Sequence, residues 1–241
     1  KLLNDPGWNN SGAVIFNNPH NASGQVFDEE IISGLLIRLL NKNIYVIDDL
    51  SYQNVAPSQE LKGPKSLKQL TNELIIKGYL PKEKEKYLIV VHSLSKTDSF
   101  AGARLAVINI PDKSLREKFV SHNKNITPNI FAIFIAYLFY RNEPEEVNSF
   151  WLRRNKIFDD RMKALEEAAA GLPLERNPFE IEIKRPSGSM YPQMIIHKLP
   201  AGLSLEWLAS GLAVQGIGLI PLSTFARTSE GFLLARKTFR L

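Results

Sequence analysis

The chain has 241 residues and a formal net charge of +5, and it is 44% hydrophobic and 23% charged, with no cysteine. This composition is typical of a globular protein with one large or two smaller domains, and the lack of cysteine excludes a disulfide framework and a thiolate metal site. Basic residues alternate with acidic ones, as in residues 82–86, so the modest positive charge does not indicate a nucleic-acid surface.

The longest apolar run, residues 130–140, has about half the length that a transmembrane helix needs. The residues that follow Lys1 show no signal-peptide pattern. We therefore predict a soluble, cytoplasmic protein with no membrane partner and no nucleic-acid partner.

The first third of the chain predicts a strand–helix–strand unit. Residues 12–16 form a short apolar run that stops at an Asn-Asn-Pro turn, as a buried strand does. Acidic residues 28–30 open a segment with apolar positions at helical spacing, and residues 44–47 read as a second strand. Two strands joined by a helix within about thirty residues favour a right-handed parallel crossover.

The same signals continue to the end of the chain. They predict helices near 67–77, 128–140, 143–170 and 205–215, and strands over 87–91, 104–108, 179–183, 193–196 and 232–239. Residues 128–140 are apolar on every side, so we expect a fully buried helix. Gly171 and Pro173 end the long helix.

We predict an α/β fold with two domains. Residues 1–145 would form a large domain around a mostly parallel sheet. Residues 146–241 would form the long connecting helix and a smaller α+β domain.

Polar side chains follow three of the predicted strands at the points where they end. They are Asn21 after the first strand, Asp49 and Tyr52 after the second, and Ser93, Ser95 and Lys96 after the third. Ligands bind at the carboxyl ends of strands in open α/β sheets. A lysine at the end of an apolar strand can be desolvated, which lowers the pKa of its amine and makes it nucleophilic. A strand that simply reaches solvent would show the same serines and lysine.

Four motifs resemble those of the class I/II aminotransferases, which are fold-type I pyridoxal-phosphate enzymes. Residues 18–24 (N-P-H-N-A-S-G) are similar to the family's N-P-x-N-P-T-G loop, and residues 49–52 match D-x-x-Y. Residues 93–104 match S-x-S-K-x-x-x-x-x-G-x-R, and residues 236–239 are similar to the closing R-x-[ST]-F strand. The motifs stand in the family's order over almost the whole chain.

The resemblance implies pyridoxal phosphate as cofactor and a role for each motif residue. Lys96 would hold the cofactor as a Schiff base and move protons, Asp49 would pair with the pyridinium nitrogen, and Asn21 and Tyr52 would contact the ring's 3-oxygen. Ser93, Ser95 and Arg104 would bind the phosphate. Arg236 would bind the α-carboxylate of an amino acid or 2-oxo acid substrate, with a surface arginine as the alternative.

The family also implies a homodimer with the active site at its interface. It normally has a long stretch before the asparagine loop, with a phosphate-binding turn and an aromatic residue that stacks on the ring. Here only twenty residues precede Asn21. We therefore expect a fragment of a longer chain, or a site completed from elsewhere.

Two other functions would use the same residues, and one further motif can be excluded. A non-catalytic aminotransferase-like ligand-binding domain would keep the same cofactor residues, and a lyase or decarboxylase would use the same lysine and aspartate. Ser93-x-x-Lys96 also fits the S-x-x-K of serine β-lactamases, but the K-T-G strand of those enzymes is absent from the sequence. The four histidines show no metal-ligand spacing, so we predict no metal.

Overall fold

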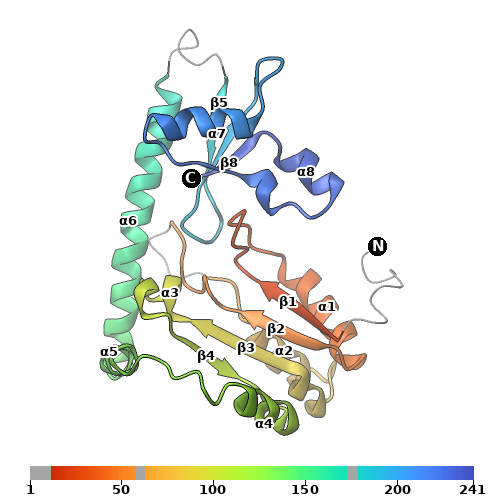
Figure 1. Ribbon diagram of the computed structural model, residues 1–241. Helices are drawn as coiled ribbons and strands as arrows, with labels where there is room; N and C mark the ends of the chain where they lie inside the picture. Colours follow the sequence, from red (N-terminus) through yellow and green to blue (C-terminus); the bar gives the residue numbers. More distant parts are fainter. Residues whose placement is uncertain (1–11, 58–62, 173–178) are drawn as a thin grey trace. The chain divides into compact units, whose positions relative to one another are not determined.

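The computed structural model describes residues 12–57, 63–172 and 179–241. Contacts between residues divide them into two units (Figure 1). Unit 1 contains residues 12–19, 26–54 and 63–151, and unit 2 contains residues 20–25, 55–57, 152–172 and 179–241. The chain leaves unit 1 for the last time between Trp151 and Leu152, inside a helix, whereas the prediction placed the domain boundary between residues 145 and 146.

Unit 1 is built on a four-stranded sheet in the order β1-β2-β3-β4 (Figure 1). The strands are β1 (Ala13–Asn17), β2 (Tyr45–Asp49), β3 (Leu88–Ser93) and β4 (Ala106–Asn109). The first three run parallel, and β4 is antiparallel to β3. The prediction of an α/β fold with a mostly parallel sheet is confirmed.

Helices α1 (Glu29–Asn41) and α2 (Leu67–Ile76) pack against the sheet, and side chains fix where each begins. Asp28 accepts hydrogen bonds from the first-turn amides of α1, and Ser66 forms a capping box with Gln69 at the start of α2. The apolar stripes of both helices meet β2 and β3 in one core. That core contains Ile32, Leu36, Leu39, Leu40, Ile44, Val46, Leu67, Leu70, Leu74, Leu80 and Leu88.

The other elements of unit 1 flank β3 in the chain. The 3-10 turn η3 (Lys82–Tyr87) precedes it, and α3 (Leu94–Thr97), the 3-10 turn η4 (Ala101–Ala103), α4 (Lys113–His122) and α5 (Ile130–Tyr140) follow it. α5 is the predicted helix, but the prediction that it is fully buried is wrong. Ala132 is its one buried residue, and Phe131 is 75% exposed. The hydrophobicity of a segment shows that it can be buried. It does not show whether another part of the structure covers it.

Helix α6 (Pro144–Ala170) begins in unit 1 and continues in unit 2. Pro173, predicted to stop this helix, lies outside the described residues. Unit 2 then has an antiparallel sheet in the order β5-β6-β8-β7, with a core of Ile196, Leu205 and Phe239. Its elements are β5 (Ile181–Lys184), β6 (Gln193–Ile196), α7 (Leu205–Val214), β7 (Ile220–Pro221), η6 (Leu222–Phe225), α8 (Ser229–Ala235) and β8 (Thr238–Arg240). The strand predicted over 232–239 is wrong for most of its length, because α8 occupies its first part.

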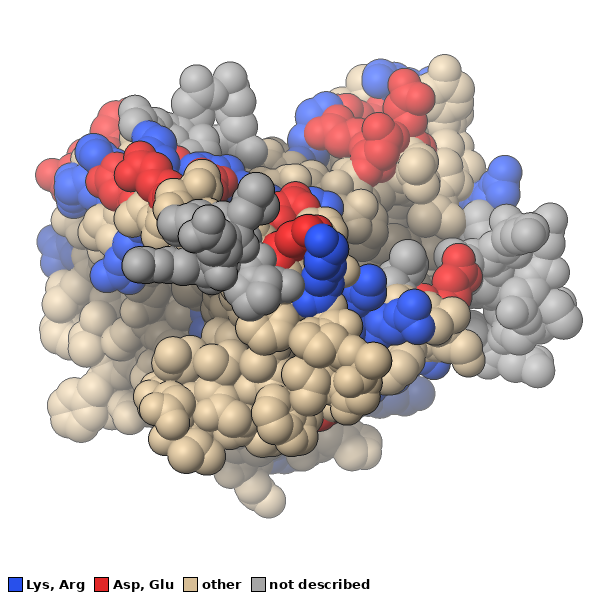
Figure 2. Space-filling model, turned by 90° about the horizontal axis from the view of Figure 1, so that it is seen from above, with Lys and Arg blue, Asp and Glu red and all other residues tan. Residues whose placement is uncertain are grey.

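Charged side chains of both signs are intermixed on the face shown in Figure 2, where lysines and arginines lie among aspartates and glutamates. This agrees with the alternating charges of the sequence. None of the helices in the described part of the chain is both long enough and apolar enough to cross a bilayer.

Candidate functional site

The turn after β2 carries two of the predicted site residues. Asp49 ends β2, and its Oδ1 accepts hydrogen bonds from the backbone amide of Ser51, at 3.0 Å, and from the Ser51 hydroxyl. Asn17, at the end of β1, donates to the backbone carbonyl of Asp49 at 3.2 Å. Tyr52 is 3% exposed. The carboxylate is therefore held by its own turn, and no described residue donates to Oδ2.

Lys96 lies in α3, directly after β3. Ser93 begins this short helix, and its hydroxyl accepts a hydrogen bond from the amide of Ser95 at 3.3 Å. Thr97 is fully buried and donates through Oγ1 to the carbonyl of Leu50 at 3.2 Å. This bond joins the lysine-bearing turn to the turn of Asp49 and Tyr52.

Arg104 reaches the same region from the other side of α3. The amide of Leu94 donates to the carbonyl of Leu105 at 3.2 Å, which places the residue next to Arg104 beside the start of α3. The Arg104 side chain is exposed, and within the described part of the chain its guanidinium donates one long hydrogen bond, of 3.4 Å, to the carbonyl of Ala101. Most donors of its guanidinium are thus open to a ligand, as a phosphate site requires.

Asn21 belongs to unit 2, where it meets an arginine that the sequence analysis did not select. Arg240, in β8, donates to Asn21 Oδ1 at 3.1 Å. Its guanidinium carbon lies 4.0 Å from the centroid of the Tyr191 ring and 5.0 Å from that of Phe225. The arginine that the sequence indicated, Arg236, is exposed at the end of α8.

The loop of Asn21 is fixed in unit 2 by close backbone approach at Gly24. The carbonyl of Gly24 accepts a hydrogen bond from the amide of Gly188 at 2.8 Å, and Gln193 donates to the carbonyl of Ser23 at 2.8 Å. Gly24 has a φ of +63°, and an added Cβ would clash with Pro186 and with the Gly188 carbonyl. A glycine is therefore required in this loop.

The predicted site residues therefore fall into two groups. Asp49, Tyr52, Ser93, Ser95, Lys96 and Arg104 lie in unit 1, and Asn21 and Arg236 lie in unit 2. The hydrogen bonds of Thr97 and Leu94 bring the first group together, while Asn21 is joined to Arg240. The signal that could have found Arg240 is its place in the last strand, one residue beyond the predicted motif.

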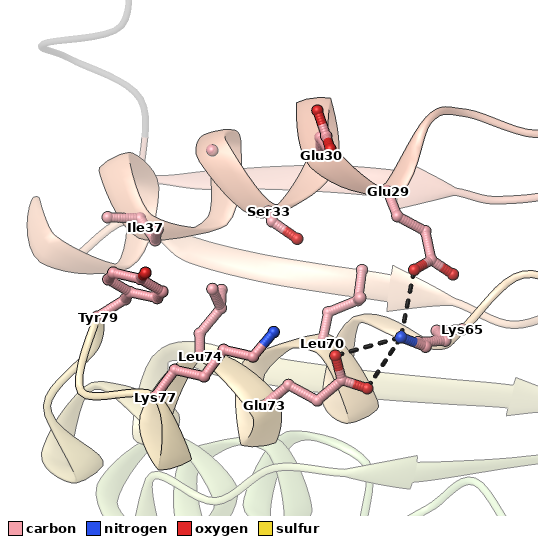
Figure 3. A pocket seen from close by; sticks show the side chains of 11 residues that line it. Glu29, Glu30, Ser33, Ile37, Lys65, Leu70, Glu73, Leu74, Lys77 and Tyr79 are labelled. Carbon is pink, nitrogen blue, oxygen red and sulfur yellow. Dashed lines mark hydrogen bonds and ion pairs between the residues drawn. The ribbon is translucent and has the colours of Figure 1, made fainter.

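A groove of about 560 Å³ runs between α1 and α2 in unit 1 (Figure 3). None of the predicted site residues lines it. Three of its charged groups pair with one another, since Lys65 lies 3.3 Å from Glu29 and 3.0 Å from Glu73. The groove is therefore separate from the candidate site.

Comparison with known proteins identifies the family. The family model for aminotransferase class I and II matches residues 2–221. The chain belongs to this family. The aspartate aminotransferase of Pyrococcus horikoshii is 24% identical over 232 residues, which cover 93% of this chain and 51% of that protein. The chain thus spans about half the length of the curated relative it matches.

Solved structures of aminotransferases share the fold. A protein from Escherichia coli with a methionine aminotransferase function has a TM-score of 0.71 at 21% identity, covering 97% of this chain and 54% of that protein. A C-S lyase from Staphylococcus hominis, solved with pyridoxal phosphate bound, has a TM-score of 0.66 at 20% identity, covering 95% and 52%.

The comparisons confirm pyridoxal phosphate as the cofactor of the family, and the residues of unit 1 fit this molecule. Asp49 Oδ2 accepts no hydrogen bond from a described residue. It is therefore a free acceptor of the kind that the N–H of a protonated pyridine ring needs. Lys96 is half-buried, so its amine is partly shielded from water, and Arg104 offers free donors for a phosphate.

Proposed function

We propose that this aminotransferase-family chain binds pyridoxal phosphate covalently at Lys96 and serves amino-group transfer from an α-amino acid. The observation that carries the proposal is the bond from Thr97 to the carbonyl of Leu50, which holds the lysine-bearing turn against the turn of Asp49. When bound, the cofactor supplies an electron sink for charge that develops at the substrate's α-carbon.

Each residue of unit 1 has a role that its surroundings support. The Lys96 amine attaches the cofactor and can then carry a proton at Nζ. Asp49 Oδ2 accepts a hydrogen bond from the ring nitrogen and keeps it protonated. Tyr52 contacts the 3-oxygen of the ring. Arg104, with the hydroxyls of Ser93 and Ser95, binds the phosphate.

In unit 2 we assign the substrate carboxylate to Arg240 in preference to Arg236. Stacking on Tyr191 and the bond to Asn21 Oδ1 orient the Arg240 guanidinium, and orientation is what bidentate binding of a carboxylate needs. Arg236, exposed at a helix end, has no comparable support. Asn21 would contact the 3-oxygen of the ring as well as Arg240.

The likeness to a C-S lyase favours a second candidate reaction on the same residues, in which a carbon–sulfur bond of the amino acid is cleaved. A domain that binds the cofactor without turnover is the third candidate. We also propose a homodimer, a cytoplasmic location and a role in amino acid biosynthesis, as the family membership suggests.

The test is the absorbance that appears when pyridoxal phosphate is added, followed by borohydride reduction and peptide mapping. We expect a band near the visible edge that reduction bleaches, with the pyridoxyl group on the Lys96 peptide. Lys96→Ala should remove both. A pyridoxyl group that stays on the same peptide in this variant would contradict the proposal, and Asp49→Ala should keep capture but lose transamination.

The two arginines form a matched pair for the substrate role. Arg240→Gln should raise the amino acid concentration that half-saturates the protein by about tenfold or more, because a charged hydrogen bond is lost. Arg236→Gln should leave it within about twofold. A larger effect for Arg236→Gln than for Arg240→Gln would assign the substrate carboxylate to Arg236 instead.

A further inference from the structure

The helix that carries Lys96 is too short to hold its own shape. α3 has four residues, and an isolated helix of one turn is unstable because nucleation costs more than one turn of hydrogen bonds returns. Its geometry must therefore come from side-chain contacts at its ends. Thr97 supplies one such contact, toward the turn of Asp49.

Asp98 supplies contacts to other elements. It follows α3 directly, and its amide donates to the carbonyl of Leu94 at 3.2 Å. Its side chain is 4% exposed. Oδ1 accepts a hydrogen bond from Trp151 Nε1 at 3.0 Å, and Oδ2 accepts one from the Tyr140 hydroxyl at 2.7 Å.

The donors to Asp98 come from two other helices. Tyr140 ends α5, and Trp151 lies in α6. The His92 ring belongs to the same cluster, since its Nε2 lies 3.3 Å from the Tyr140 hydroxyl and 3.9 Å from Asp98 Oδ2. Burial and the bond to Asp98 both raise the pKa of Tyr140, so this hydroxyl keeps its proton and remains a donor. Hydrogen bonds to a shielded carboxylate are stronger than those between neutral groups.

We propose that Asp98 is the positioning residue of the lysine-bearing turn: by binding Trp151 and Tyr140 it anchors α3 to α5 and α6 and aims the Lys96 amine. The S-x-S-K-x-x-x-x-x-G-x-R motif leaves position 98 open, so the role follows from these contacts alone. The proposal rests on Lys96 being the point of cofactor attachment. In that step the Lys96 amine condenses with the aldehyde carbon of pyridoxal phosphate, and one water is released.

The experiment compares Asp98→Asn and Trp151→Phe with the parent protein in two cofactor measurements. The first is the rate of covalent capture of pyridoxal phosphate, fixed by borohydride and mapped to the Lys96 peptide. The second is the dissociation constant of pyridoxamine phosphate, which has no aldehyde and cannot react with the lysine. We expect capture to slow by about tenfold or more while the dissociation constant changes by less than about twofold.

The matched control is Asp112→Asn. Asp112 also accepts a hydrogen bond from a tyrosine hydroxyl, that of Tyr45 at 3.0 Å, and one from a backbone amide, that of Leu115 at 2.9 Å. It stands beside the first residue of β2, whereas Asp49 ends that strand, so the control should leave both cofactor measurements unchanged. If Asp98→Asn weakens both measurements equally, or changes neither, the positioning role is overturned.

A third readout works without cofactor. Amide hydrogen exchange over residues 94–99 should be about tenfold faster in both variants than in the parent, since the anchor that limits local opening is removed. Absence of capture in the parent protein would refute the proposed function and leave this readout to decide the anchoring role. Unchanged exchange would refute the anchor itself, whatever the cofactor measurements show.

Discussion

Unit 1 contains two regions that both carry apolar side chains and differ in burial. On the β1–β3 side (β1, β2, β3, α1 and α2) the apolar side chains that face the core are enclosed, and Leu36 and Val46 have no exposed surface, while Ile15, Ile31 and Ile76 point away from the core and are exposed. On the β4–α5 side (β4, α4 and α5) all four residues of β4 are exposed, and Val107 is 61% exposed. Val107 pairs with His92, whose ring contacts Tyr140 at the end of α5, so the exposed strand and the exposed helix both meet the same residue of β3.

The difference shows how far apolar sequence decides burial. On the β1–β3 side each apolar stripe finds its partner within the same strand–helix–strand unit. The β4–α5 side also has apolar residues, on β4 and α5, but the described part of the chain does not cover them. Contiguous exposed apolar surface is uncommon on a monomeric domain.

The largest expected effect is the loss of stability when a large apolar side chain on each side is replaced by alanine. Leu36→Ala should lower the free energy of unfolding by about 2–5 kcal/mol, because it opens a cavity in a closed core. Phe131→Ala on α5 should lower it by less than about 1 kcal/mol, because this ring is already in solvent. Urea denaturation measures both. Equal losses of unfolding free energy in the two variants would show that α5 is packed in solution, which would contradict the difference in burial between the two sides.

A second test uses one carboxylate on each side, the buried Asp48 and the partly exposed Asp112. Asp48 is 1% exposed and accepts a hydrogen bond from the amide of Leu67, at the start of α2, at 2.8 Å. Burial raises its pKa from 3.8 to about 7. The unfolded chain therefore loses this proton at lower pH than the folded chain, so the contribution of Asp48 to stability is greatest below pH 4 and is lost as the pH rises to about 7.

Asp48→Asn should remove this fall, which is at most about 4 kcal/mol. Asp112, the first cap of α4, behaves in the opposite direction. The hydrogen bonds from Leu115 and Tyr45 lower its pKa, so its contribution is present above the ordinary carboxyl pKa and is lost as the pH falls through the lowered value. Urea denaturation at several pH values reports both slopes, and a flat profile for the parent protein would contradict the assignment of Asp48.

The smallest effect concerns the exposed side itself. Val107→Lys should change the free energy of unfolding by less than about 0.5 kcal/mol and reduce the fluorescence of a dye that binds apolar surface. Val214→Lys in unit 2, where Val214 is 83% exposed, controls for the added charge. A large loss of stability for Val107→Lys alone would mean that β4 is covered.

Local signals predicted most of the fold. Acidic residues 28–30 and the apolar spacing after them predicted α1, which begins at the Asp28 cap. The segments predicted as helical near 67–77 and 205–215 are α2 and α7, which begin at the caps Ser66 and Ser204. α4 was missed because its polar sequence has no apolar period. Residues 232–239 were misread because a short apolar run fits a strand and a helix equally, and Thr228, which caps α8, was not recognised.

The candidate site was predictable where a motif places all its residues on one turn. The lysine and aspartate turns are of this kind, and the structure brings them together through Thr97. The role of Arg240 was not predictable, because two arginines stand four residues apart and only strand β8 shows which one meets Asn21. Asp98 was equally hidden, since its partners lie 42 and 53 residues away along the chain.

The discontinuity of unit 2 has a consequence for biosynthesis. Asn21 and Arg240 are 219 residues apart, and Gln193 meets Ser23 across 170 residues. At about 5–20 residues per second, the ribosome exposes the asparagine loop many seconds before its partners exist. The β1–α1–β2 region can close at once through local contacts, whereas the first residues of unit 2 must wait for partners such as Gly188, Gln193 and Arg240, which are made much later. Unit 2 should therefore be the late-folding unit and the first to open when the chain is shortened at its C-terminal end.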